Sequence, residues 1–140
     1  MKPNLSIFTL LAIVLSFGLT TKANALGPAC IKAKQYAYNY LVSAENALNI
    51  AYSGMISQGN TSGIEQCRLA VYFKDAGDTQ FSHLDGYKTI GLYATSGKFM
   101  VAAYSTTSDS SIQYYLSSAY NNLASSNSWV GYLRNYCEWK

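Results

Sequence analysis

Apolar residues recur at spacings of three and four along two long stretches of this 140-residue chain. The first stretch runs from Pro28 to about Ile56, and its apolar positions are Tyr40, Leu41, Ala44, Ala47, Leu48, Ala51, Tyr52 and Met55. The second follows Ser108-Asp109, a pair typical of a helix N-cap, and its apolar positions are Ile112, Tyr115, Leu116, Ala119, Tyr120 and Leu123. Because this spacing places a side chain on the same face at every turn, both stretches are predicted to be amphipathic helices.

Shorter helices are predicted for residues 63–74 and 129–139. Asp and Gly at 75–78 are expected to end the first, and the polar run at 125–128 to separate the second from the helix before it. Residues 79–106 fit a helix or a β-hairpin, and the helical neighbours favour the helix. The predicted fold is mainly α, a compact bundle of four to five helices. The alternative is an α+β fold with a hairpin at about 87–105.

The first 25 residues have the pattern of a cleavable signal peptide. Lys2 precedes an apolar run from Leu5 to Leu19, and Ala23-Asn24-Ala25 matches a cleavage site. The run is short for a bilayer span, so a retained membrane anchor is the less favoured alternative. We therefore predict an exported, periplasmic or extracellular protein, with a single helical domain of residues 26–140 and no membrane span in the mature chain.

The charge of the mature chain is close to neutral. Loss of Lys2 and Lys22 from the ten basic residues leaves eight, against seven acidic residues. The basic residues are scattered, so the chain has no electrostatic pattern for nucleic acid, and no nucleic-acid partner is expected.

Three cysteines remain after cleavage, namely Cys30, Cys67 and Cys137. An exported chain meets an oxidising compartment, where one disulfide would leave one thiol over. Spacing alone allows three pairings. We favour Cys30 with Cys137, because the two ends of an antiparallel bundle with an even number of helices lie on the same side. Cys67 would then be a buried thiol or a link between two chains.

Catalytic and metal-binding patterns are weak. His83, the only histidine, lies two residues before Asp85, but no nucleophile motif accompanies the pair. Glu45 and Glu65 lie on the first two predicted helices and could approach each other, as a glycan hydrolase would need. The more economical interpretation places both carboxylates on solvated helix surfaces. No catalytic residue, metal site or cofactor is predicted.

An aromatic-rich C-terminal segment is the best sequence candidate for recognition. It contains Trp129, Tyr132, Tyr136 and Trp139, and tyrosine and tryptophan are enriched at binding hot spots. The alternative is that this segment docks on the core. The leading functional hypothesis is an exported, non-enzymatic protein that binds another protein, for example as an inhibitor or immunity factor. The alternatives are a carrier of a small apolar ligand and a hydrolase acting on glycans.

Overall fold

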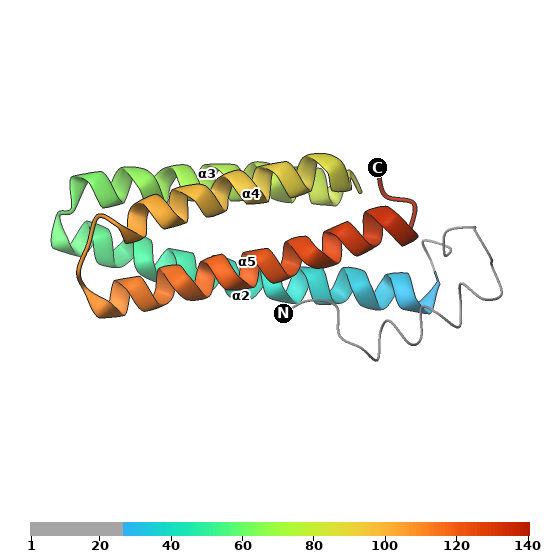
Figure 1. The fold of residues 1–140 in the computed structure, drawn as a ribbon, viewed down its shortest axis with the longest axis horizontal. Helices are drawn as coiled ribbons and strands as arrows, with labels where there is room; N and C mark the ends of the chain where they lie inside the picture. The colour runs from blue at the N-terminus through green and yellow to red at the C-terminus, as the bar shows by residue number, and fades with distance from the viewer. Residues whose placement is uncertain (1–26) are drawn as a thin grey trace.

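Four α-helices make up the computed structural model, which describes residues 27–140. They are α2 (Pro28–Gln58), α3 (Thr61–Ser82), α4 (Gly86–Tyr104) and α5 (Ser110–Tyr136) (Figure 1). The mainly α bundle is confirmed. The alternative hairpin at 87–105 is wrong, because this segment forms α4 and residues 27–140 contain no strand. The predicted signal peptide, residues 1–25, lies outside the described residues.

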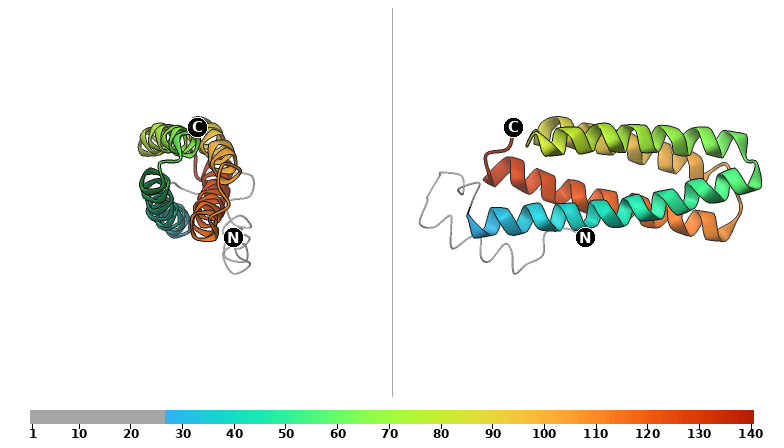
Figure 2. Two further views of the ribbon diagram at one scale, coloured as in Figure 1. Left: turned by 90° about the vertical axis from the view of Figure 1, so that its left-hand side faces the viewer. Right: turned by 180° about the vertical axis from the view of Figure 1, so that it is seen from behind.

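Successive helices run antiparallel and are joined by short connections (Figure 1). The most extensive contacts pair α2 with α5 and α3 with α4, and α4 also packs along α5. Contacts between α2 and α3 are the sparsest of the four neighbouring pairs. The end-on view in Figure 2 shows the two pairs as two layers. No helix within residues 27–140 is both long enough and apolar enough to span a bilayer.

Side-chain caps define where three of the helices begin. Asn60, Asp85 and Asp109 each accept a hydrogen bond from a backbone N–H in the first turn of the helix that follows. Asp109 therefore has the capping role predicted for it. Pro28 occupies the first turn of α2, also as expected, and Gly59 ends that helix with a left-handed φ of 65°.

The predicted break at residues 75–78 is wrong, because α3 continues to Ser82. Asp78 lies one turn after Lys74 and accepts a hydrogen bond from its ammonium. Gly77 faces α4, where a Cβ would lie 2.5 Å from the ring of Tyr93. These residues resemble a turn signal in the sequence, but Asp78 also accepts a hydrogen bond from the Tyr93 hydroxyl of α4. Both residues therefore contact the neighbouring helix, and the segment stays helical.

The predicted break at residues 125–128 is also wrong, because α5 is continuous to Tyr136. Ser125 and Ser126 are buried, and the Ser126 hydroxyl donates to the backbone carbonyl of Ala37 on α2 at 2.8 Å. In the other helix pair, Ser96 of α4 donates to the carbonyl of Ala70 on α3 at 2.6 Å. Small side chains at these positions let the helices approach closely, so the serines belong to helix interfaces and the bundle has four helices.

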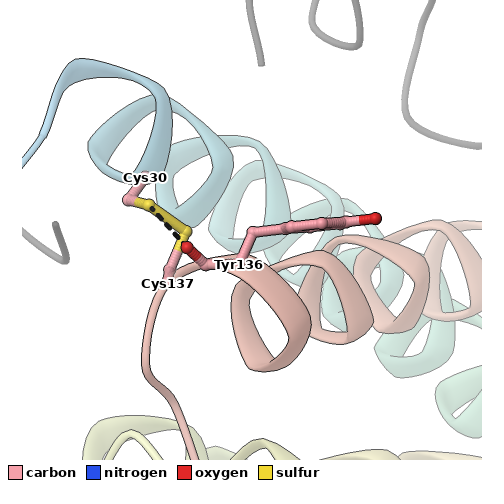
Figure 3. The surroundings of a disulfide bond; sticks show 3 residues. All are labelled: Cys30, Tyr136 and Cys137. Atoms are coloured by element: carbon pink, nitrogen blue, oxygen red, sulfur yellow. Dashed lines mark hydrogen bonds between the residues drawn. A yellow bond between two sulfur atoms is a disulfide. The ribbon is translucent and has the colours of Figure 1, made fainter. Parts of the chain in front are cut away.

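A disulfide joins Cys30, in the first turn of α2, to Cys137, which directly follows α5 (Figure 3). The predicted pairing is therefore present, and the two Cα atoms are 5.7 Å apart. The Cys30 sulfur also contacts the carbonyl oxygen of Tyr136 at 3.9 Å.

The last residues close this end of the bundle over the α3–α4 connection. Trp139 is buried, with its ring edge-on to Phe81 at 5.1 Å between centroids. The Lys140 N–H donates to the carbonyl of Leu84, and the carbonyl of Lys140 accepts from the N–H of Tyr87. The disulfide and this tail together tie all four helices at one end.

Candidate functional site

The aromatic segment predicted as a recognition surface is mostly part of the core. Trp129, Tyr132 and Trp139 are 0%, 3% and 5% exposed, and Tyr136 is partly buried. The ring of Trp129 lies 5.0 Å from that of Tyr36 on α2 and 5.5 Å from that of Tyr132. Trp129 and Tyr132 lie on the side of α5 that packs against α2, whereas Trp139 lies beyond the end of α5 and packs against Phe81 of α3. Most of the predicted surface is therefore buried in the core.

The most polar buried feature is an ammonium surrounded by carboxylates. Lys74 is 2% exposed. Its Nζ lies 3.1 Å from Glu45 Oε2 on α2, 2.8 Å from Asp75 Oδ1 and 3.0 Å from Asp78 Oδ2. The Tyr93 hydroxyl on α4 donates to the other oxygen of Asp78 at 2.7 Å. One charged cluster therefore connects α2, α3 and α4 where contacts between α2 and α3 are sparse.

Electrostatics keep Lys74 in its charged form. Burial by itself would lower the pKa of Lys74, but the hydrogen bonds that its ammonium donates to Asp75, Asp78 and Glu45 outweigh this effect and hold the pKa above its ordinary value. Burial raises the pKa of Asp78, and the hydrogen bonds that Asp78 accepts from Tyr93 and Lys74 oppose this rise. An ammonium that holds its proton cannot serve as a nucleophile or a general base. The cluster is therefore suited to joining helices.

The weaker catalytic candidates are dispersed. Glu45 bonds to Lys74, whereas Glu65 pairs with Arg68 on its own helix, so the two glutamates have separate cationic partners. His83 is exposed at the C-cap of α3, and Asp85 caps α4. No group of three or more potential metal ligands comes together within the part of the chain that the structure describes.

An open hollow of about 610 Å³ lies along the seam between α4 and α5, the two helices nearest the viewer in Figure 1. Tyr93 and Leu123 are buried beneath it, and Val101 and Tyr120 form exposed walls. Gly97 supports this shape, because a Cβ at this position would lie 3.2 Å from the ring of Tyr120. The remaining lining residues are Ala94, Lys98, Ala124, Asn127 and Ser128.

A second hollow of about 220 Å³ continues the first toward the C-terminus of α4. The two share Val101 and Tyr120, and the second adds Met100, Tyr104, Leu116 and Ser117. We call the two together the α4–α5 groove. A further hollow of about 650 Å³ lies at the other end of α4, where the Arg134 guanidinium stands 5.5 Å from the centre of the Tyr87 ring.

Charge is distributed unequally between the two halves of the bundle. Neither α4 nor α5 contains an acidic residue, and their charged residues are Lys88, Lys98 and Arg134. The seven acidic residues lie on α2, α3, the connections and the tail, at Glu45, Glu65, Asp75, Asp78, Asp85, Asp109 and Glu138. The α4–α5 groove is therefore mainly apolar, and the single charged residue in its lining, Lys98, makes its rim basic.

Sequence reasoning missed this groove. The available signal was the absence of Asp and Glu from residues 86–136 except at Asp109. That signal is informative only once two helices are known to be neighbours. Comparisons with protein-family models, with curated proteins and with solved structures find no match to this chain.

Cys67 is a buried free thiol, as one of the two sequence interpretations expected. Burial raises its pKa to about 11, so the thiol stays protonated at neutral pH. We predict that a disulfide reagent labels Cys67 in the folded protein roughly 100-fold more slowly than it labels an exposed cysteine. Absorbance of the released thiolate measures this rate, and denaturant should restore fast labelling of one thiol per chain. Rapid labelling of the native protein would contradict the burial of this group.

Proposed function

We propose that this chain is an exported, non-enzymatic binding protein whose α4–α5 groove holds a segment of another protein. The observation that carries the proposal is an exposed apolar hollow, open along the seam of two helices. Val101, Tyr120 and Tyr104 are 54%, 43% and 40% exposed and lie side by side in it. Contiguous apolar surface of this kind is typical of interaction sites, and tyrosine is a frequent hot-spot residue.

Export is supported by the disulfide between Cys30 and Cys137, since such bonds persist mainly in oxidising compartments. It is also supported by the signal-peptide pattern of the first 25 residues. A non-enzymatic role is supported by the state of the charged cluster, where Lys74 holds its proton and is surrounded by carboxylates.

A protein segment fits the groove better than a small apolar ligand. The volume of the larger of the two hollows in this groove lies within the range of small-molecule sites, about 300–1,000 Å³. Small-molecule sites, however, bury most of the ligand surface. Here the walls are exposed side chains and the hollow continues into a second one. A small apolar ligand would remain largely in contact with water, whereas a protein segment could cover the full length of the groove.

The test uses protein produced from the full-length sequence in an exporting host, purified in its oxidised form and immobilised. Native envelope or culture-medium extract is passed over the wild type, Val101→Asp and Val42→Asp. Val42 is the matched control, because it is an exposed valine on α2, away from the groove. We expect the wild type and the control to capture the same protein in stoichiometric amount. Val101→Asp should capture at least about ten-fold less, because a carboxylate would be desolvated in the interface.

Circular dichroism and thermal unfolding would verify that both variants are folded. Equal capture by all three proteins would contradict a role for the α4–α5 groove. If the wild type is recovered with a bound small molecule and without a protein partner, the result would contradict the proposal and favour a ligand carrier.

A further inference from the structure

The shape of the α4–α5 groove limits the kind of protein segment that it can hold. The two hollows follow α4 from Tyr93 to Tyr104. At 1.5 Å per residue this distance is roughly 17 Å, about three helical turns. An amphipathic helix uses anchors at positions i, i+3 or i+4, and i+7, which lie within about two turns. The groove therefore has room for one helix laid along the seam.

Apolar contacts in the groove lie where such anchors would reach. The buried floor has the Tyr93 ring and Leu123, and the walls have Val101, Tyr104 and Tyr120. A flat lipid surface would meet the outer faces of α4 and α5 before it reached this floor. A convex, narrow object such as a helix reaches both floor and walls. The concave placement of the apolar surface favours a helix over a membrane.

Charge at the rim adds a second requirement. Lys98 lines the α4–α5 groove, and Lys88 lines the separate hollow at the other end of α4. Both side chains are exposed. Neither forms an ion pair within residues 27–140. No carboxylate lines any of the three hollows. A partner with carboxylates beside its apolar stripe would complement this rim, whereas a basic partner would be repelled.

We infer that the partner presents an amphipathic helix whose apolar stripe is flanked by Asp or Glu, and that this helix lies along the α4–α5 groove. The inference rests on the proposed function and adds the secondary structure and the charge of the bound segment. The apolar side chains supply most of the affinity, and the basic rim selects the sign of the partner's charge.

The test titrates two synthetic 18-residue helical peptides into the ¹⁵N-labelled, oxidised protein. Both have the same leucine stripe, flanked by glutamate in one peptide and by lysine in the other. Backbone amide shifts report weak binding and its location. We expect the glutamate peptide to move amides around Ala94, Lys98, Val101 and Tyr120, and to bind at least about ten-fold more tightly than the lysine peptide. The difference should shrink at high salt.

Charge reversal provides the matched variants. Lys98→Glu should weaken binding of the glutamate peptide about ten-fold and strengthen binding of the lysine peptide, because the substitution reverses one charge at the rim. Lys34→Glu, on the exposed surface of α2, should change neither affinity. A general loss of structure would weaken both peptides, so the opposite changes expected for Lys98→Glu separate recognition from folding.

Three outcomes would overturn the inference. The first is equal binding of the two peptides by the wild type. The second is amide shifts confined to α2 and α3. The third is that anionic phosphatidylglycerol vesicles move the groove amides while neither peptide does. If Val101→Asp still abolished capture of the natural partner, the proposed function would stand and only the helical, acidic nature of its segment would fail. If Val101→Asp left capture unchanged, the proposed function itself would fail.

Discussion

Replacing Cys30 and Cys137 together by serine is expected to lower the free energy of unfolding by about 4 kcal/mol. The disulfide closes a loop of sequence separation 107, which is nearly the whole described chain. Cross-linking such distant residues removes many conformations from the unfolded chain, and this model-dependent entropy is the main source of the expected effect. Chemical denaturation followed by circular dichroism, without reductant, measures the difference between the variant and the wild type.

Reduction of the wild type serves as the control. A thiol reductant should bring the wild type close to the stability of the serine variant and leave the variant itself unchanged. If reduction leaves the denaturation midpoint of the wild type where it was, the cross-link contributes nothing and the prediction fails. The native helix content should survive in both proteins, because the tail is also held by Trp139 and by the backbone hydrogen bonds of Lys140.

Lys74→Met is expected to lower the free energy of unfolding by about 3 kcal/mol at neutral pH. Methionine retains much of the packing of the lysine stem, but three carboxylates lose their shared ammonium. Glu45 and Asp75 are exposed enough to be solvated by water, whereas Asp78 is only partly exposed and is held by Tyr93. The main loss therefore comes from Asp78 without a counter-ion. Chemical denaturation measures the loss.

Two further variants separate charge from packing. Lys34→Met, at an exposed position of α2, should change stability by less than about 0.5 kcal/mol. Adding Asp78→Asn to Lys74→Met should recover part of the loss, because the unpaired charge is removed while the amide oxygen can still accept from Tyr93. Wild-type stability in Lys74→Met alone would show that the ion cluster has no net stabilising effect.

The difference in stability between the wild type and Lys74→Met is also expected to depend on pH in the alkaline range. In the unfolded chain Lys74 loses its proton near pH 10.5, whereas the folded protein holds the pKa of Lys74 above that value. Its stabilising contribution is therefore complete below pH 10.5 and is lost as the pH rises through the folded pKa. The difference in stability between the wild type and Lys74→Met should narrow above pH 10.5, by up to about 1.4 kcal/mol per pH unit.

Buried tyrosines are expected to lower the stability of both proteins as the pH rises. Burial raises the pKa of Tyr132 to about 12, and it also raises the pKa of Tyr93. Unfolded tyrosines ionise near pH 10, so the folded state binds more protons above this pH and its stability falls as the pH rises. Denaturation measured in steps between pH 8 and pH 11.5 would separate this common decline from the narrowing due to Lys74. A constant difference across that range would contradict the role assigned to Lys74.

Local patterns in the sequence determined much of this fold. The three-and-four spacing of apolar residues in 28–56 and 112–123 matches α2 and α5, because it reflects the geometry of a single helix. Asp109 was recognisable as a cap for the same reason, since capping involves only residues within one turn. The pairing of Cys30 with Cys137 also follows from an even number of antiparallel helices, because the two ends of such a bundle lie on the same side. The structure contains this disulfide.

The tertiary structure decided what depends on contacts between helices. Asp78, Gly77 and Ser126 are interpreted as breaks from the sequence, yet each contacts a neighbouring helix. Asp78 accepts a hydrogen bond from the Tyr93 hydroxyl, Gly77 leaves room for the Tyr93 ring, and Ser126 donates to the Ala37 carbonyl. Intrinsic propensity is worth less than about 1 kcal/mol per residue, so such contacts override it.

The candidate site was beyond prediction for the same reason. Whether an aromatic residue lies in the core, as Trp129 does, or on a groove wall, as Tyr120 does, depends on which helices are neighbours. The α4–α5 groove combines residues from two helices that are separate in the sequence, and it exists only because α4 packs along α5. Periodicity along one helix identifies the buried face, but the partner of that face is chosen by packing over the whole chain.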